Sequence, residues 1–197
     1  MEKKAELLSR KVISYILPSA CGMLMGFIFF KGMIFQPHVT LFQFVIVSIE
    51  ASIIFNILKD TNLKNSIAAV FVIFLVNSFF TYSFHSLGYL LRDLLYILAV
   101  FFSVYFFFRI FYLKFKTYFY PLVFGILFLL LHFIVDLTLM IIYAVPEFWR
   151  RLNNQVTIAA LIGVGIGLGI FINDTIIPLL EEKEDETEEE KNDIEEE

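Results

Sequence analysis

The chain has 197 residues, of which 59% are hydrophobic, with a mean hydropathy of +0.79 and a formal net charge of −5. Because soluble domains are only about 45–50% apolar, this composition excludes an ordinary soluble domain and predicts an integral membrane protein. The single cysteine, Cys21, excludes a disulfide framework or a cysteine metal cluster within one chain. We expect no metal, no cofactor and no nucleic-acid partner.

The first apolar run follows a basic segment. Residues 1–11 contain four Lys or Arg residues, and the apolar run covers residues 12–30. A signal peptide is the alternative, but the run exceeds the roughly 7–15 residues of a signal-peptide core, and no small-residue cleavage pattern precedes Lys31. The pattern predicts a basic cytoplasmic N-terminus and a retained first helix.

Five further apolar runs are near the roughly 20 residues that cross a bilayer core. They cover residues 39–58, 67–84, 94–108, 119–145 and 157–180. The fourth run is the shortest, and its apolar neighbours can lengthen it around Arg92 and Arg109. We therefore predict an all-α, polytopic transmembrane helix bundle of about six spans over residues 12–180.

The basic residues predict the orientation of this bundle. With six spans, 11 Lys and Arg residues fall on the side of the two termini and 4 on the other side. Under the positive-inside rule both termini are then cytoplasmic, although Arg150 and Arg151 mildly violate the rule. We expect a protein of the plasma (inner) membrane.

The charge is divided between two parts of the chain. Residues 1–180 carry 13 basic and 8 acidic side chains, whereas residues 181–197 carry 2 basic and 12 acidic ones. A segment with so little apolar surface and so much like charge predicts a disordered, acidic cytoplasmic tail. The tail either recruits a basic partner or divalent cations, or is a solvated end after the last helix.

Four polar residues fall near the middle of the predicted spans, and they form the candidate ligand-binding or proton-binding site. They are Glu50, Asn77, His132 and Asp136. Such side chains are costly in lipid and should face the interior of the bundle. His132 and Asp136 are one helical turn apart, so they can hydrogen-bond to each other. The pair suits a proton relay, a polar-ligand contact or half of a metal site with Glu50, and the alternative is a structural bond between helices.

Glycines mark two of the predicted spans. In the sixth span Gly163 and Gly167 lie on one face, with a second small-residue face beside it, and the first span has Gly22 and Gly26. Small residues four positions apart allow close helix approach. These residues predict tight packing, either within the protein or with a protein partner or a second copy.

No motif in the chain names a reaction. Phe128, His132 and Asp136 spell F-x-x-x-H-x-x-x-D, which is similar to a fragment of the intramembrane CAAX-type prenyl endopeptidases. That family also requires a paired-glutamate motif on an earlier helix, whereas Glu50 stands alone. No G-x-S-x-G, H-E-x-x-H or Walker sequence occurs. An enzyme is therefore less expected than a non-enzymatic protein.

Two polar features fall at the cytoplasmic ends of the predicted spans. The segment 109–121 interleaves basic and aromatic residues, a pattern that binds anionic lipid heads or a partner but also occurs in an ordinary interfacial belt. Asn173 and Asp174 come near the end of the sixth span, where we expect them to contact water or this segment.

The sequence as a whole favours a transport function. Our first interpretation is a small transporter, or a membrane substrate-binding subunit, that uses the mid-bilayer residues for a small polar solute, an ion or protons. The alternative is a non-enzymatic scaffold or assembly subunit of a larger complex, held to its partners by the glycine faces and the acidic tail.

Overall fold

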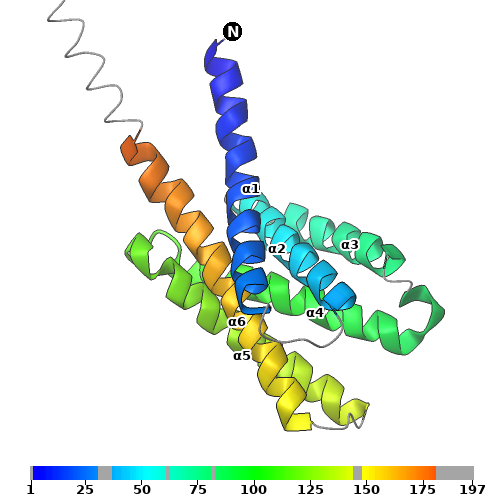
Figure 1. Cartoon of the computed structure of the whole chain (residues 1–197). Coiled ribbons are helices and arrows are strands. Elements are labelled where there is room, and N and C mark those ends of the chain that lie inside the picture. Colours follow the sequence, from blue (N-terminus) through cyan, green and yellow to red (C-terminus); the bar gives the residue numbers. More distant parts are fainter. Residues whose placement is uncertain (1, 31–36, 61–62, 81–82, 144–147, 181–197) are drawn as a thin grey trace, which may run out of the picture.

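The computed structural model describes residues 2–30, 37–60, 63–80, 83–143 and 148–180, and this part of the chain contains helices and no strands. The predicted acidic tail lies outside the described residues. The long helices are α1 (Glu2–Phe30), α2 (Pro37–Asp60), α3 (Leu63–Phe80), α4 (Leu87–Phe106), α5 (Tyr120–Ile142) and α6 (Phe148–Phe171) (Figure 1). The shorter turns are η1 (Ser83–His85), η2 (Phe107–Phe111), η3 (Thr117–Phe119) and η4 (Ile172–Ile176).

Four of these helical segments are long and apolar enough to cross a membrane. They are Ser9–Ile28, Leu87–Phe111, Thr117–Ile142 and Gln155–Leu180, and Leu63–Phe79 is a shorter apolar helix. The expectation of an all-helical, membrane-embedded protein is therefore supported by the structure. The count of six spans stays a prediction.

Three of the helix bounds bear directly on the predicted runs. Helix α4 begins at Leu87 and continues through η2, so the fourth apolar run is lengthened around Arg92 and Arg109 as predicted. The third run was predicted to reach residue 84, but Ser83 belongs to the separate 3₁₀ turn η1. The Ser83 hydroxyl donates a hydrogen bond to Asp93 Oδ2 at 2.5 Å. Helix α6 begins at Phe148, so Arg150 and Arg151 lie within its first turn and not in a loop.

Helix α6 packs extensively against both α5 and α1, and Figure 1 shows it crossing beside them. One glycine face meets α5. A Cβ atom added at Gly163 would lie 2.8 Å from the carbonyl oxygen of Phe124, and one added at Gly167 would lie 2.6 Å from that of Tyr120. These distances leave no room for a side chain, so α5 and α6 touch through their backbones.

The second glycine face of α6 meets α1. A Cβ atom at Gly165 would collide with the carbonyl group of Cys21, and one at Gly169 would collide with the backbone of Pro18. Because lipid tails are as apolar as the helices, close van der Waals packing of this kind is a main source of helix association in membranes. Both glycine faces of α6 are thus occupied by helices of the same chain.

Helix α2 is held to α1 at a defect in the α1 backbone. Pro18 lies inside α1 and has no N–H to donate to the Ser14 carbonyl one turn earlier. The Asn56 amide of α2 donates to that carbonyl at 2.9 Å. Ser52, one turn before Asn56, donates from Oγ to the Tyr15 carbonyl at 2.6 Å. Since a bilayer core supplies no water to such groups, these bonds fix α2 against α1.

The chain alternates between two ends of the bundle. The end that we call the termini end contains the first turns of the α1 span, the ends of α2, η2 and η4, and the start of α5, because residues from all five line one pocket. The opposite end contains η1, the start of α4 and the end of α5, where the Tyr143 hydroxyl donates to the Gly88 carbonyl at 2.8 Å. Residues 10–14 of α1 and residues 173–178, near the two ends of the described chain, therefore lie at the same end.

Candidate functional site

A group of polar side chains is buried where α2, α4 and α5 meet. We call Glu50, Arg92, Asp93, Tyr96 and Asp136 the buried cluster. The three carboxyl groups are between 2% and 5% exposed as residues. Burying ionisable groups inside apolar helices is costly, so a set of this kind is a functional-site candidate.

Helix α4 supplies the middle of the buried cluster. The Arg92 guanidinium donates to Asp93 Oδ1 from Nε at 3.1 Å and from Nη2 at 3.0 Å. Ser83 donates to the other oxygen of Asp93 at 2.5 Å. One turn further along α4, the Tyr96 hydroxyl donates to Asp136 Oδ1 of α5. The Asp93 and Asp136 carboxylates are therefore each held by identified donors.

Glu50 differs from the other two carboxyl groups. It lies on α2, close enough to Asp93 for the two groups to interact electrostatically. Its Oε1 atom is buried and has no hydrogen-bond partner among the residues that the structure describes. A buried polar atom without a partner is rare in proteins, and each instance needs an explanation such as an ion, a proton or a ligand.

His132 lies beside the buried cluster without joining its hydrogen bonds. Its Nδ1–H donates to the Phe128 carbonyl one turn earlier at 2.9 Å, and its ring stacks on Phe128 with centroids 5.2 Å apart. The Tyr96 ring lies on another side of it, at a centroid distance of 6.2 Å. The hydrogen bond that the spacing predicted between His132 and Asp136 does not form, because both side chains find other partners.

The remaining predicted site residue lies on a different helix. Asn77 is half-buried on α3, which packs against α2, α4 and η1. The structure thus brings Asp136 together with Tyr96, and Glu50 near Asp93.

The predicted packing glycines of α1 are both buried. A Cβ atom at Gly22 would lie 2.8 Å from Ser48 Oγ of α2 and 2.9 Å from Ile166 Cγ1 of α6, so α1 approaches both helices closely there. Gly26 lies one turn further along the same helix.

Sequence reasoning missed the contribution of α4 to this site. Arg92 and Asp93 precede the predicted fourth span, and Tyr96 looks like one aromatic residue among many. The spacing of these three residues could have indicated that they belong to one site. Residues at positions 92, 93 and 96 share one side of a helix, so the lengthened fourth helix would have placed all three together inside the bundle.

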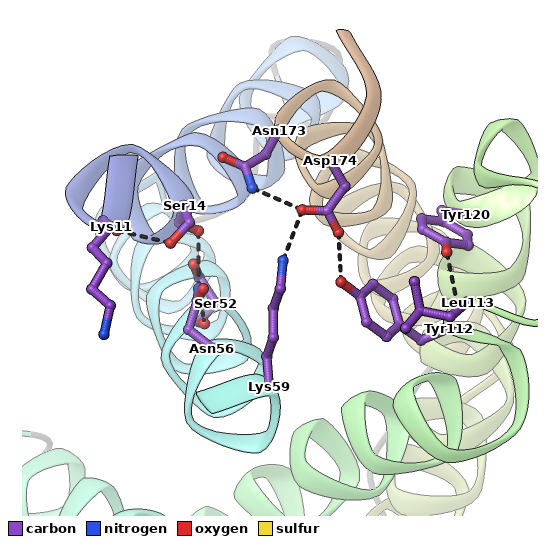
Figure 2. Close-up of polar contacts among 10 residues, drawn as sticks. All are labelled: Lys11, Ser14, Ser52, Asn56, Lys59, Tyr112, Leu113, Tyr120, Asn173 and Asp174. Carbon is purple, nitrogen blue, oxygen red and sulfur yellow. Dashed lines mark hydrogen bonds and ion pairs between the residues drawn. The ribbon is translucent and has the colours of Figure 1, made fainter. Parts of the chain in front are cut away.

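A second polar site lies at the termini end, around Asp174 (Figure 2). Its Oδ1 accepts from Lys59 Nζ of α2 at 3.0 Å and from the neighbouring Asn173 amide at 2.9 Å. Its Oδ2 accepts from the Tyr112 hydroxyl at 2.8 Å. We expected Asn173 and Asp174 to contact water or the segment 109–121, and the Tyr112 bond shows the second contact for Asp174, while Asn173 bonds to Asp174 itself.

Two π-helical turns, η2 and η4, adjoin this site. Asp174 belongs to η4, and Tyr112 follows η2 directly, with its N–H bonded to the Phe107 carbonyl. Single π-helical turns often occur at functional sites, because they shift the side chains that follow. Burial raises the pKa of the Tyr112 phenol well above its ordinary value, and the Asp174 carboxylate raises it further.

The same end has a pocket of about 450 Å³, which we call the termini pocket. Its basic side chains are Arg10, Lys11 and Lys59, and its acidic ones are Asp60 and Asp174. Pockets of 300–1,000 Å³ are typical of small-molecule sites. The volume and the polar lining therefore suit a small ligand.

In the ranges that the structure describes, no group of three or more His, Cys, Asp or Glu side chains is arranged to coordinate a metal ion. Comparison with known proteins finds no matching protein family, no matching curated protein and no matching solved structure. The function is therefore argued from the two polar sites.

Proposed function

We propose that the protein is a small transporter, or the membrane substrate-binding subunit of a larger one, which binds a proton or a small cation at the buried cluster. The observation that carries the proposal is Glu50, whose buried Oε1 has no partner among the described residues and whose carboxyl group interacts with that of Asp93. A shared proton or a bound cation stabilises two carboxyl groups in such surroundings. Within this proposal the chain crosses the plasma (inner) membrane about six times with both termini in the cytoplasm.

The charges of the buried cluster support a cationic ligand. It contains three carboxyl groups, on Glu50, Asp93 and Asp136, and one permanent cation, Arg92. The guanidinium is bonded to Asp93, so two carboxyl groups have no cationic partner in the cluster. Ionisable residues that face the interior of a membrane bundle often mark ion or proton pathways.

The alternative of a membrane scaffold draws less support. It relied on the glycine faces and on the acidic tail, which lies outside the described residues. Of the glycines, Gly163 and Gly167 contact α5, and Gly165 and Gly169 contact α1. Enlarging one of these glycines would disturb the fold of a single chain before it disturbed a partner. The glycine faces therefore do not argue for a partner.

The test is an ion-flux assay with the full chain reconstituted in liposomes that contain a pH-sensitive dye. A potential would be imposed across the membrane, and proton flux would be compared with uptake of small inorganic and organic cations. Wild-type protein is expected to exceed empty liposomes for at least one of these ions. Glu50→Gln and Asp136→Asn should each slow that flux by about tenfold or more, equal to about 1.4 kcal/mol.

The matched control is Asp60→Asn, which removes a carboxylate from the exposed termini end and should change the flux by less than about twofold. Asp136→Asn keeps an oxygen that accepts from Tyr96, so the variant should still fold and insert. Equal flux in wild-type protein and both cluster variants would contradict the proposal, and the absence of flux for every ion tested would contradict a transporter that works as a single chain.

A further inference from the structure

The termini pocket is lined by more basic than acidic side chains. Three basic side chains line it, Arg10 and Lys11 from α1 and Lys59 from α2, against two carboxylates. Asp174 is already bonded to Lys59, Asn173 and Tyr112, so its charge is satisfied by groups of the protein.

The second carboxylate, that of Asp60, forms an exposed ion pair. Asp60 pairs with Lys11 at 3.4 Å, and the two side chains are 40% and 61% exposed. Exposed ion pairs of this kind add little stability, so an anion with more acceptor oxygens can replace Asp60 as the partner of Lys11. In Figure 2 the Lys11 ammonium group points away from the Asp174 hydrogen bonds.

The depth of the pocket points to a lipid. The candidate membrane span of α1 begins at Ser9, which would place Arg10 and Lys11 at the level where a bilayer changes from hydrocarbon to headgroup. Val12 and Ile16, which follow on α1, are 48% and 59% exposed. Apolar residues of the pocket wall, among them Ile13, continue this surface.

We infer that the termini pocket binds the phosphate headgroup of an anionic phospholipid. The phosphate accepts from Arg10 and Lys11, as in other basic pockets between membrane helices, and the acyl chains follow the exposed apolar side of α1. The lipid site does not depend on the proposed ion transport, since it shares no residue with the buried cluster.

The test is native mass spectrometry of the delipidated full chain titrated with phosphatidylglycerol, phosphatidylcholine or soluble glycerol 3-phosphate. Wild-type protein is expected to bind one phosphatidylglycerol and to prefer it to phosphatidylcholine. Removing two basic groups with Arg10→Gln and Lys11→Gln should weaken this binding by about tenfold or more. The control, Lys114→Gln with Lys116→Gln, removes two exposed charges outside the pocket wall and should change the binding by less than about twofold.

A second variant fills the pocket without changing its charge. Ile177→Trp enlarges a residue of the pocket wall and should also reduce phosphatidylglycerol binding. It provides the test if the double variant with Arg10→Gln and Lys11→Gln does not fold. Equal phosphatidylglycerol binding by wild-type protein and the folded pocket variants would overturn the inference. It would also be overturned by equal binding of phosphatidylcholine, or by glycerol 3-phosphate binding through Arg10 and Lys11 where phosphatidylglycerol does not bind.

Discussion

At the scale of single residues, the two polar sites differ in how completely their groups are bonded. Asp174 has three donors, and its Oδ2 is held by Tyr112, which is only 8% exposed. Glu50 instead keeps one buried oxygen without a partner among the described residues. A fully bonded polar group rigidifies its surroundings, whereas a buried polar atom without a partner calls for an explanation such as strain, a functional role, or a bound water or ion. This contrast supports a structural role for the Asp174 bonds and agrees with the proposed binding role of Glu50.

Replacing Tyr112 by Phe tests the structural role of Asp174. The variant loses a hydrogen bond to a carboxylate and should be less stable by about 1–2 kcal/mol near neutral pH. The raised pKa of Tyr112 means that the folded protein holds the phenol proton more tightly than the unfolded chain does. This stabilising effect is fully present below the ordinary value of 10.0 and declines as the pH rises above it.

The measurement is the unfolding temperature of both proteins in detergent across this pH range. The difference between wild-type protein and Tyr112→Phe should be largest near neutral pH and should narrow above about pH 10. Tyr118→Phe, at a tyrosine that is 55% exposed, is the control and should behave as wild type. A constant difference at all pH values would contradict the assignment.

At the scale of helices, backbone contacts set the arrangement more than side-chain size does. Both glycine faces of α6 meet the backbones of neighbouring helices, one on α5 and the other on α1. The carbonyl of Ser14 that Pro18 leaves without its helix partner is bonded by Asn56 from α2. Each contact covers backbone groups or forms hydrogen bonds with them, and lipid tails cannot form such bonds. In this bundle, neighbouring helices therefore meet where one of them has a glycine without a side chain or a proline without a backbone N–H.

A double-mutant cycle tests the bond at the proline. Asn56→Leu leaves the Ser14 carbonyl without its side-chain donor and should cost about 1–3 kcal/mol of unfolding free energy. Pro18→Ala restores a backbone N–H to that carbonyl, so Asn56→Leu should cost less in the Pro18→Ala background. The coupling between the two sites should be at least about 0.5 kcal/mol. Additive costs, measured by reversible unfolding in detergent, would show that Asn56 does not compensate for the proline.

At the scale of the whole molecule, segments from near both ends of the described chain meet at one end of the bundle. Residues near the start of α1 and near the end of α6 line the same pocket with the end of α2 and the segment after α4. Most basic residues of the chain belong to this end in the predicted topology. The anionic inner leaflet attracts such residues, which agrees with the inferred lipid site.

Reporter fusions test the predicted orientation. A reporter that is active only in the cytoplasm should be active when fused after residue 180 and inactive when fused after residue 143, because one membrane helix separates these positions. A reporter that is active only outside the cytoplasm should give the opposite pattern. Activity of the cytoplasmic reporter at both positions would contradict the final hairpin, and reversal of both signals would contradict the orientation.

The sequence alone determined the class of this protein and the residues from which a site can be built. The backbone N–H and C=O groups of a long apolar run can form all their hydrogen bonds in a bilayer when the run is a helix. A Glu or Asp inside such a run is easily noticed, because an ionisable side chain is costly there. Glu50 and Asp136 were therefore found from the sequence, and so were the glycine faces of α6. Only the tertiary structure decided which groups meet. The partners of Asp136 and Asp174 are Tyr96 and Tyr112, which are far from them in the chain, and aromatic residues are too common in these helices for pattern alone to distinguish the two that donate hydrogen bonds.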